Sequence, residues 1–239
     1  MTNLFDMKSF DINIDQGSLV SLILILLVFV PMLLCVAFMT IIERKAMGSM
    51  QRRIGPNVVG YYGVLQPFAD ALKLVVKEQI IPAQSNKALF FLAPMISLVF
   101  SLLGWATIPF GSGMAIADLS LGMLFSLAVS SIGVYGALFA GWAANSKYAF
   151  LGSLRSTAQM VSYELIFSTC VAAVILLAGS LNFTTIVEAQ TSIWFIVPLF
   201  PLFIMYLISA LAELNRTPFD LPEAESELVS GFMTEHSGM

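Results

Sequence analysis

The chain has 239 residues, of which 58% are hydrophobic and only 11% are charged. Soluble domains have about 25% charged residues, so this composition excludes an ordinary soluble domain and indicates a membrane protein. The formal net charge of -4 gives no reason to expect nucleic acid as a partner. Cys35 and Cys170 lie far apart in apolar runs and His236 is the single histidine, so the sequence favours neither a disulfide nor a metal site.

Five long, charge-poor stretches divide the chain. A membrane-spanning helix needs about 20 mostly apolar residues, and each of these stretches is long enough. We therefore predict an all-α membrane protein with five transmembrane helices in a single membrane domain, followed by an acidic loop over 214–239. The predicted spans cover residues 19–42, 88–110, 119–143, 157–180 and 190–213.

The distribution of basic residues predicts the orientation. In this topology ten of the eleven Lys and Arg residues lie on one side of the membrane, and only Lys8 lies on the other. Loops rich in Lys and Arg stay on the cytoplasmic side, which corresponds to the matrix side in a mitochondrion. These loops are also the long ones, so we expect function there. The ten residues are Arg44, Lys45, Arg52, Arg53, Lys73, Lys77, Lys87, Lys147, Arg155 and Arg216.

The first of these loops contains an amphipathic segment over 64–78. Such a helix is typical of the membrane interface, where its apolar face can wall an opening for a lipid-soluble ligand. The alternative is a helix that packs on its own bundle. At helical spacing, one face has Gln66, Asp70, Lys73 and Lys77, and the other has Val64, Leu65, Phe68, Leu72 and Val75.

Acidic residues mark the other two loops. Glu164 lies about two turns inside Thr157, and a carboxylate at such depth usually faces a cavity or a partner. The stretch from Glu213 onward has six acids and one base, interleaved with apolar side chains. Clustered carboxylates in half-buried surroundings share protons, which favours a proton conduit or a charge sensor. The alternatives are a helix-end glutamate at the interface and an ordinary solvated acidic loop.

Four strings in these loops resemble subunit 1 of NADH:ubiquinone oxidoreductase, respiratory complex I. They are the residues 43–57, 65–70, 152–155 together with 162–164, and 213–227. They occur in the family's order and topology, and the resemblance extends from about residue 19 onward.

The resemblance implies a subunit that joins the hydrophilic electron-transfer arm to the proton-pumping membrane arm. It implies part of the quinone tunnel at Arg44, Arg52, Phe68, Asp70, Ala71 and Lys73. It implies an acidic proton or coupling path through Glu164, Glu213, Asp220, Glu223, Glu225 and Glu227.

The same resemblance implies the cofactors and partners. Ubiquinone is the expected substrate, and this chain is expected to hold no redox centre, catalytic residue or metal of its own. FMN and the iron–sulfur clusters are expected in partner subunits, which include the quinone-site subunit and the subunit with the terminal cluster. The expected location is the mitochondrial inner membrane, or less favourably a bacterial inner membrane.

The family has eight spanning helices, whereas five are predicted here. We therefore expect a second polypeptide with the remaining helices, as a split gene would produce. The alternative is a truncated chain. Two other functions stay open at this stage. One is the homologous membrane subunit of a hydrogenase-type complex, and the other is an ion transporter subunit, with a purely structural anchor as a further option.

Overall fold

The computed structural model describes residues 18–111, 115–216, 218–221 and 231–236. Within these ranges every regular element is a helix, so the predicted all-α membrane fold is confirmed. The described residues form two compact units, one ending at Gln79 and the other beginning at Ile80. Each unit is described below by itself.

The first unit has one long helix and one short one. Helix α1 covers Ser18–Met50, η2 is a single turn over Tyr61–Gly63, and α2 covers Gln66–Val76. The α1 helix continues past the predicted end of the span at residue 42, because the following Glu, Arg, Lys, Ala and Met are good helix formers. The α2 helix lies within the predicted amphipathic segment, and α1 and α2 pack against each other.

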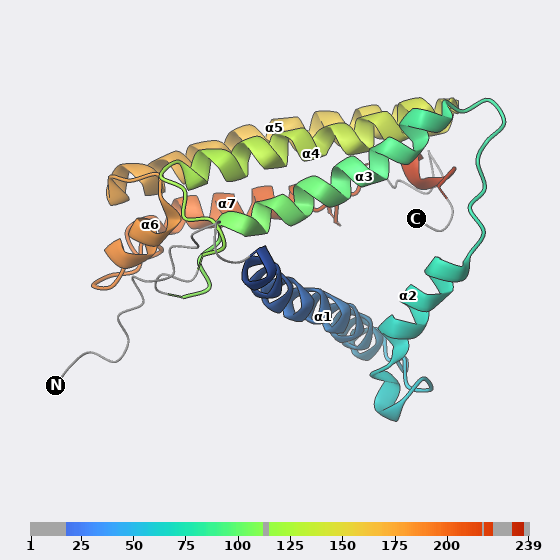
Figure 1. Ribbon diagram of the computed structural model, residues 1–239, viewed down its shortest axis with the longest axis horizontal. Helices are drawn as coiled ribbons and strands as arrows, with labels where there is room; N and C mark the ends of the chain where they lie inside the picture. Colours follow the sequence, from blue (N-terminus) through green and yellow to red (C-terminus); the bar gives the residue numbers. More distant parts are fainter. Residues whose placement is uncertain (1–17, 112–114, 217, 222–230, 237–239) are drawn as a thin grey trace. The chain divides into compact units, whose positions relative to one another are not determined.

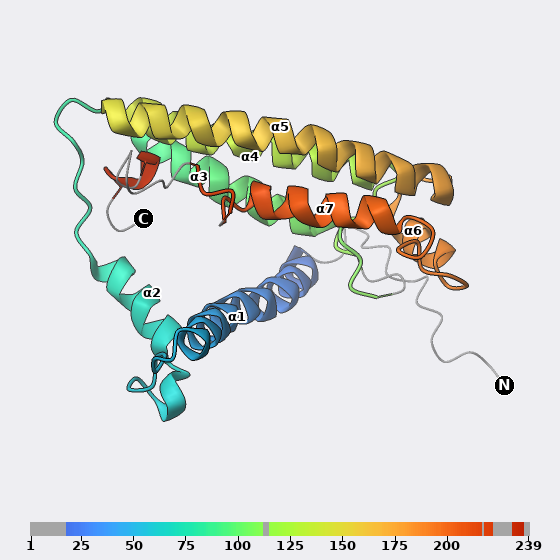
Figure 2. The same ribbon diagram turned by 180° about the vertical axis from the view of Figure 1, so that it is seen from behind.

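The second unit is a helical bundle. Its elements are α3 (Lys87–Gly104), η3 (Trp105–Thr107), α4 (Gly122–Ala143), α5 (Lys147–Ala178), α6 (Phe183–Ala189), α7 (Phe200–Glu213) and η4 (Gly231–Met233). Both ribbon views show α3, α4 and α5 side by side, with α4 in the middle, and α7 packs on α5 (Figures 1 and 2). The turn η4 packs against α4 and α5.

Small residues allow α4 to approach both of its neighbours. A Cβ added to Gly136 would overlap the Ser97 side chain of α3, and one added to Gly141 would overlap the Ser153 side chain of α5. Close helix packing at small residues is typical of membrane bundles, where burial from water no longer drives association.

Two helices of the bundle differ from the sequence prediction. The segment 145–156, expected as a loop, is mostly the beginning of α5, because Ala149, Gly152, Ser153 and Ser156 form a small buried face of that helix. The last helix, α7, has 14 residues instead of the full span predicted over 190–213. Pro198 and Pro201 lie at its beginning, and proline interrupts the hydrogen bonds of a helix interior.

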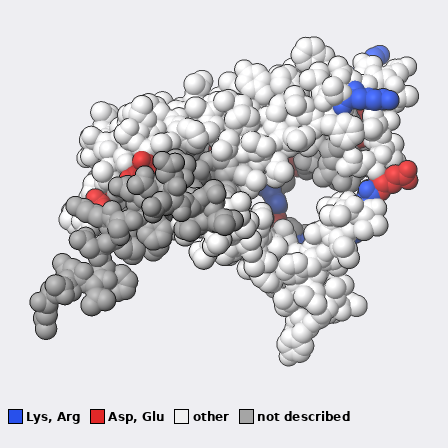
Figure 3. Space-filling model, in the orientation of Figure 1, with Lys and Arg blue, Asp and Glu red and all other residues white. Residues whose placement is uncertain are grey.

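Four described helices are long and apolar enough to cross a membrane, namely those over Leu22–Met50, Lys87–Thr107, Gly122–Ala143 and Lys147–Ala178. The apolar helix over Phe200–Glu213 is shorter. On the visible face in Figure 3 the long helices of the bundle show few charged side chains. This surface fits an apolar solvent, as expected for membrane-spanning helices.

Candidate functional site

The first unit contains an ion pair between its two helices. The guanidinium Nη1 of Arg44, near the end of α1, lies 2.6 Å from Oδ2 of Asp70 in α2. One turn earlier in α2, Nε2 of Gln66 donates to the other carboxylate oxygen of Asp70 at 3.0 Å. Both oxygens of Asp70 therefore have a donor, and two of the residues predicted for the quinone tunnel, Arg44 and Asp70, lie in direct contact.

This arrangement keeps Asp70 ionised. The hydrogen bond from Arg44, and then the one from Gln66, hold the pKa of the Asp70 carboxyl below its usual value of 3.8. Side-chain exposures of 50% for Arg44 and 36% for Asp70 show that solvent screens the pair. The contact therefore orients the two side chains more than it stabilises the fold.

The remaining tunnel candidates belong to the same unit and differ in their contacts. The ring of Phe68 packs edge-on against Phe38 of α1, with ring centroids 6.1 Å apart. Ala71 and Lys73 are exposed on α2. Arg52 follows α1 in an exposed turn, where it has a positive φ of 56°.

The loop between α1 and α2 is tied back to α1. The ammonium group of Lys45 donates to the Tyr62 carbonyl at 2.5 Å and lies 5.9 Å from the centroid of the Tyr62 ring. Gly63 has a φ of 76°, and a Cβ at this position would overlap the Pro56 backbone, so glycine is required there. Lys45 and Tyr62 were not among the residues predicted for the site.

In the second unit, two predicted carboxylates meet adjacent serines of α4. Ser131 donates a short hydrogen bond to Oε1 of Glu164 in α5. Ser130 donates to Oε1 of Glu213, at the end of α7, at 3.1 Å. Glu164 and Glu213 are 49 positions apart in the sequence, and α4 brings both to neighbouring positions on one helix.

The serines were missed from the sequence because a serine in an apolar run usually bonds to its own helix. The pair at 130 and 131 differs from such residues only in its position opposite the two glutamates. The sequence signal was therefore weak, since the register of α4 against α5 and α7 is needed to see it.

A buried glutamine ties α5 to the segment after α7. Gln159 is 5% exposed, and its Nε2 donates to the Ala212 carbonyl at 2.7 Å and to the Phe219 carbonyl at 2.8 Å. A third, longer contact of 3.2 Å joins it to the side chain of Asn215. Asp220, which follows Phe219 in the chain, has one buried carboxylate oxygen without a hydrogen-bond partner. Gln159 therefore fixes where the acidic segment begins.

Three residues of the predicted acidic path, Glu223, Glu225 and Glu227, lie outside the described residues. The structure therefore brings together Glu164 and Glu213 and positions Asp220 next to the segment held by Gln159.

His236 packs against the beginning of α3. Its ring stacks on Phe90 with centroids 4.1 Å apart and an angle of 11° between the planes. Both ring nitrogens are buried without a hydrogen-bond partner. Burial lowers the pKa of His236 below its usual value of 6.5, although the nearby Ala140 carbonyl and Glu235 oppose this shift.

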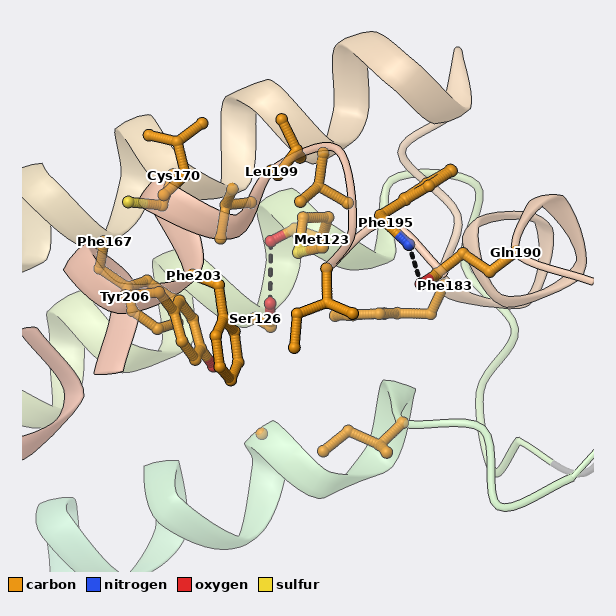
Figure 4. Close-up of a pocket in the computed structure, with 16 residues that line it drawn as sticks. Met123, Ser126, Phe167, Cys170, Phe183, Gln190, Phe195, Leu199, Phe203 and Tyr206 are labelled. Atoms are coloured by element: carbon orange, nitrogen blue, oxygen red, sulfur yellow. Dashed lines mark hydrogen bonds between the residues drawn. The ribbon is translucent and has the colours of Figure 1, made fainter. Parts of the chain in front are cut away.

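An apolar cavity of about 660 Å³ lies at the other end of the bundle. Figure 4 shows Phe167, Phe203 and Tyr206 at one side of it and Phe183 and Phe195 at the other. Two polar side chains of the lining already bond within the chain, since Ser126 donates to the Met123 carbonyl and Gln190 accepts from the Phe195 amide. This cavity was not predicted from the sequence, and its wall is suited to an apolar occupant.

Among the described residues, no three His, Cys, Asp or Glu side chains are grouped as metal ligands would be. Cys35 and Cys170 are both free thiols.

The fold and these sites define a multi-helix membrane protein with carboxylates held at helix–helix contacts. The family model described as NADH dehydrogenase matches residues 23–239, and the chain belongs to this family. It is 74% identical to NADH-ubiquinone oxidoreductase chain 1 of Mycosarcoma maydis, over 92% of this chain and 67% of that one.

Two further relatives extend the similarity. The chain 1 protein of Podospora anserina is 62% identical over 92% of this chain and 60% of its own. An NADH-quinone oxidoreductase subunit of Rhodospirillum centenum is 58% identical over 90% of this chain and 64% of its own. The chain thus spans about two thirds or less of the length of these relatives.

Proposed function

We propose that this chain is a multi-pass membrane subunit of a proton-pumping NADH:ubiquinone oxidoreductase in the mitochondrial inner membrane. Its family and the names of its relatives support this role. The chain contributes no redox centre. The reaction's electrons pass through FMN and iron–sulfur clusters in partner subunits, and this chain contributes residues to the path of the quinone and to the path of protons.

The orientation follows from the basic residues. In the second unit the amide of Asn86 donates to the Ala143 carbonyl at 3.0 Å, so the beginning of α3 lies beside the end of α4. Lys87, at the beginning of α3, and Lys147, at the beginning of α5, are therefore at one end of the bundle. The proposed matrix side is this end, where the partner subunits with the quinone site and the terminal cluster bind.

The proposed quinone-side residues are in the first unit. The Arg44–Asp70 pair and the Phe68–Phe38 contact join α1 to α2. The exposed residues Ala71 and Lys73 are then left for the quinone path, with Arg52 in the turn after α1. An amphipathic helix of this kind suits the interface from which a lipid-soluble substrate enters.

The proposed proton path is acidic and begins with Glu164 and Glu213, followed by Asp220, Glu223, Glu225 and Glu227. The observation that carries this proposal is the convergence of Glu164 and Glu213 on adjacent serines of α4. Carboxylates within membrane helices are costly and are usually retained for function. Here their partners are hydroxyl groups, which leave each carboxylate able to take up and release a proton.

The test is Glu213→Gln in the assembled complex that contains this chain, reconstituted in vesicles. Glutamine keeps the shape and accepts a hydrogen bond from Ser130, but it cannot ionise. Loss of a group needed for proton transfer typically lowers the rate about 10²–10⁴-fold. Other carboxylates of the path could carry protons in place of Glu213, so we expect a loss of about 10²-fold or less. We expect a lower quinone reductase rate and lower proton pumping, with normal assembly on native gels.

The matched control is Glu188→Gln. Glu188 is an exposed glutamate of α6, the short helix that follows α5, and it is not among the residues of the proposed path. This control is expected to keep wild-type rates. Wild-type quinone reduction and pumping in an assembled Glu213→Gln complex would exclude Glu213 from the proton path.

A further inference from the structure

The two serines of α4 have different hydrogen-bond possibilities. The Oγ atom of Ser130 contacts the Glu213 carboxylate at 3.1 Å. The Oγ atom of Ser131 is within hydrogen-bond distance of two oxygens, that of the Glu164 carboxylate and that of the Leu127 carbonyl at 3.0 Å. Both neighbours of Ser131 are oxygens, so the single hydroxyl hydrogen decides what this site can do.

A serine hydroxyl has one hydrogen to donate and two lone pairs to accept with. The Leu127 carbonyl only accepts. When Ser131 donates its hydrogen to the Leu127 carbonyl, it can only accept a hydrogen bond from Glu164. The Glu164 carboxyl must then be protonated, so that it can donate to Ser131. When Glu164 is ionised, the hydroxyl must turn its hydrogen toward the carboxylate and release the carbonyl.

We propose that Ser131 is a positioning residue that supports both charge states of Glu164 by rotating its hydroxyl hydrogen between the Leu127 carbonyl and the Glu164 carboxylate. The heavy atoms need not move between the two states. The backbone carbonyl of Leu127 loses little on release, because the α4 helix supplies its own amide donor. This inference rests on the proposed role of Glu164 in proton transfer and specifies what makes that transfer reversible.

Other ionisable groups share this region with Glu164. Its carboxylate is bonded to Ser131 of α4, and the other elements packed against α5 are α6, α7 and η4. The titratable or charged side chains on α4, α5, α6, α7 and η4 and in the adjoining described segments are Asp118, Tyr135, Lys147, Tyr148, Arg155, Tyr163, Cys170, Glu188, Tyr206, Glu213, Arg216, Asp220, Glu235 and His236.

The test is the pH dependence of quinone-linked turnover in the assembled complex with Ser131→Ala. Alanine removes a donor from the ionised carboxylate and an acceptor from the protonated carboxyl. A hydrogen bond to a charged group is the stronger of the two, so the ionised state loses more. We expect the pH–rate profile to move toward higher pH by about one unit, as the usual strength of such a bond predicts.

Two variants make the result specific. Ser131→Thr keeps the hydroxyl and is expected to keep the wild-type profile. Ser126→Ala is the matched control, because Ser126 lies on the same helix and bonds only to its own helix, at Met123, at 2.9 Å. An unshifted profile for Ser131→Ala, or an equal shift for Ser131→Thr or Ser126→Ala, would overturn the inference.

The failure of this inference differs from the failure of the proposed function. If Glu164→Gln lowers turnover while Ser131→Ala keeps the wild-type profile, the proton path stands and the role of Ser131 is excluded. If Glu164→Gln leaves turnover unchanged, the proposed role of Glu164 itself fails, and the inference fails with it.

Discussion

The carboxylates of the two units have different hydrogen-bond donors. Asp70 has donors on both oxygens, one of them a guanidinium, and the pKa of its carboxyl is lowered. Glu164 and Glu213 are bonded to serine hydroxyls instead. A guanidinium fixes a charge, whereas a hydroxyl can serve a carboxyl group in either protonation state. The comparison supports the proposal that the first site orients its helices and that the second exchanges protons.

The pH dependence of the first site follows from the direction of its shift. Because the folded chain holds the pKa of Asp70 below 3.8, its contribution is fully present above that value and is lost only as the pH falls further. The Arg44–Asp70 contact is therefore intact near neutral pH.

The largest expected effect is that of Glu164→Gln, which breaks the second site. We expect proton pumping and quinone-linked turnover to fall by about 10²-fold or more, since removal of a proton-transfer group typically costs about 10²–10⁴-fold. The rates are measured in vesicles, with assembly checked on native gels. If Glu164→Gln lowered pumping and turnover no more than Asp70→Asn does, the proposed distinction between the two sites would be wrong.

A smaller effect is expected from Gln159→Leu, which leaves the partly buried Phe219 carbonyl without its donor and the Ala212 carbonyl with backbone amide donors alone. Buried acceptors without partners cost about 1–3 kcal/mol, so the segment around Asp220 loses its fixed position. We expect turnover to fall about tenfold with less assembled complex. Gln190→Leu, at the other end of the bundle, is the matched control, and equal losses in both variants would indicate a general packing defect.

Ala71→Gln tests the proposed role of the first unit in the quinone path. Ala71 is exposed one residue after Asp70, where added bulk would narrow the proposed quinone path. We expect quinone reduction to fall several-fold while reduction of a hydrophilic electron acceptor is unchanged. Equal loss of both activities would point to misassembly.

The smallest effect concerns His236, a third titratable group, whose buried ring stacks on Phe90. Its pKa is lowered by burial, so the packing of 231–236 on the bundle is favoured above the usual value of 6.5 and weakens as the pH falls below it. The protection of this segment against hydrogen exchange, taken relative to the intrinsic exchange rate at each pH, is expected to fall between pH 7 and pH 5. His236→Phe is expected to remove this dependence, and its persistence in that variant would assign it to another group.

Much of this fold could be predicted from the sequence because charge is so unevenly distributed along it. Charge-poor stretches predict the long helices, and the alternation of Gln66, Asp70 and Lys73 with apolar residues predicts α2. The early beginning of α5 could not be predicted, because its polarity is typical of a loop, whereas its small residues pack on α4. The shorter α7 reflects the prolines near its beginning, which interrupt the helix although the apolar run continues.

The sequence indicates candidate residues for both sites, but it does not indicate their contacts. Arg44, Asp70, Glu164 and Glu213 are all indicated by the sequence, yet the partners of the glutamates are not. Serines 130 and 131 lie in an apolar run, and only the packing of α4 on α5 and α7 places them opposite the carboxylates. Such tertiary pairings have no local signal in a single sequence.

Infrared difference spectroscopy of the working complex tests the contrast between the two sites most directly. Carboxyl groups that gain or lose a proton during turnover give a protonated-carboxyl band that shifts in deuterium oxide. We predict that Glu164→Gln removes part of this band and that Asp70→Asn leaves it unchanged, with both complexes assembled. A band that is lost in Asp70→Asn and retained in Glu164→Gln would contradict the account.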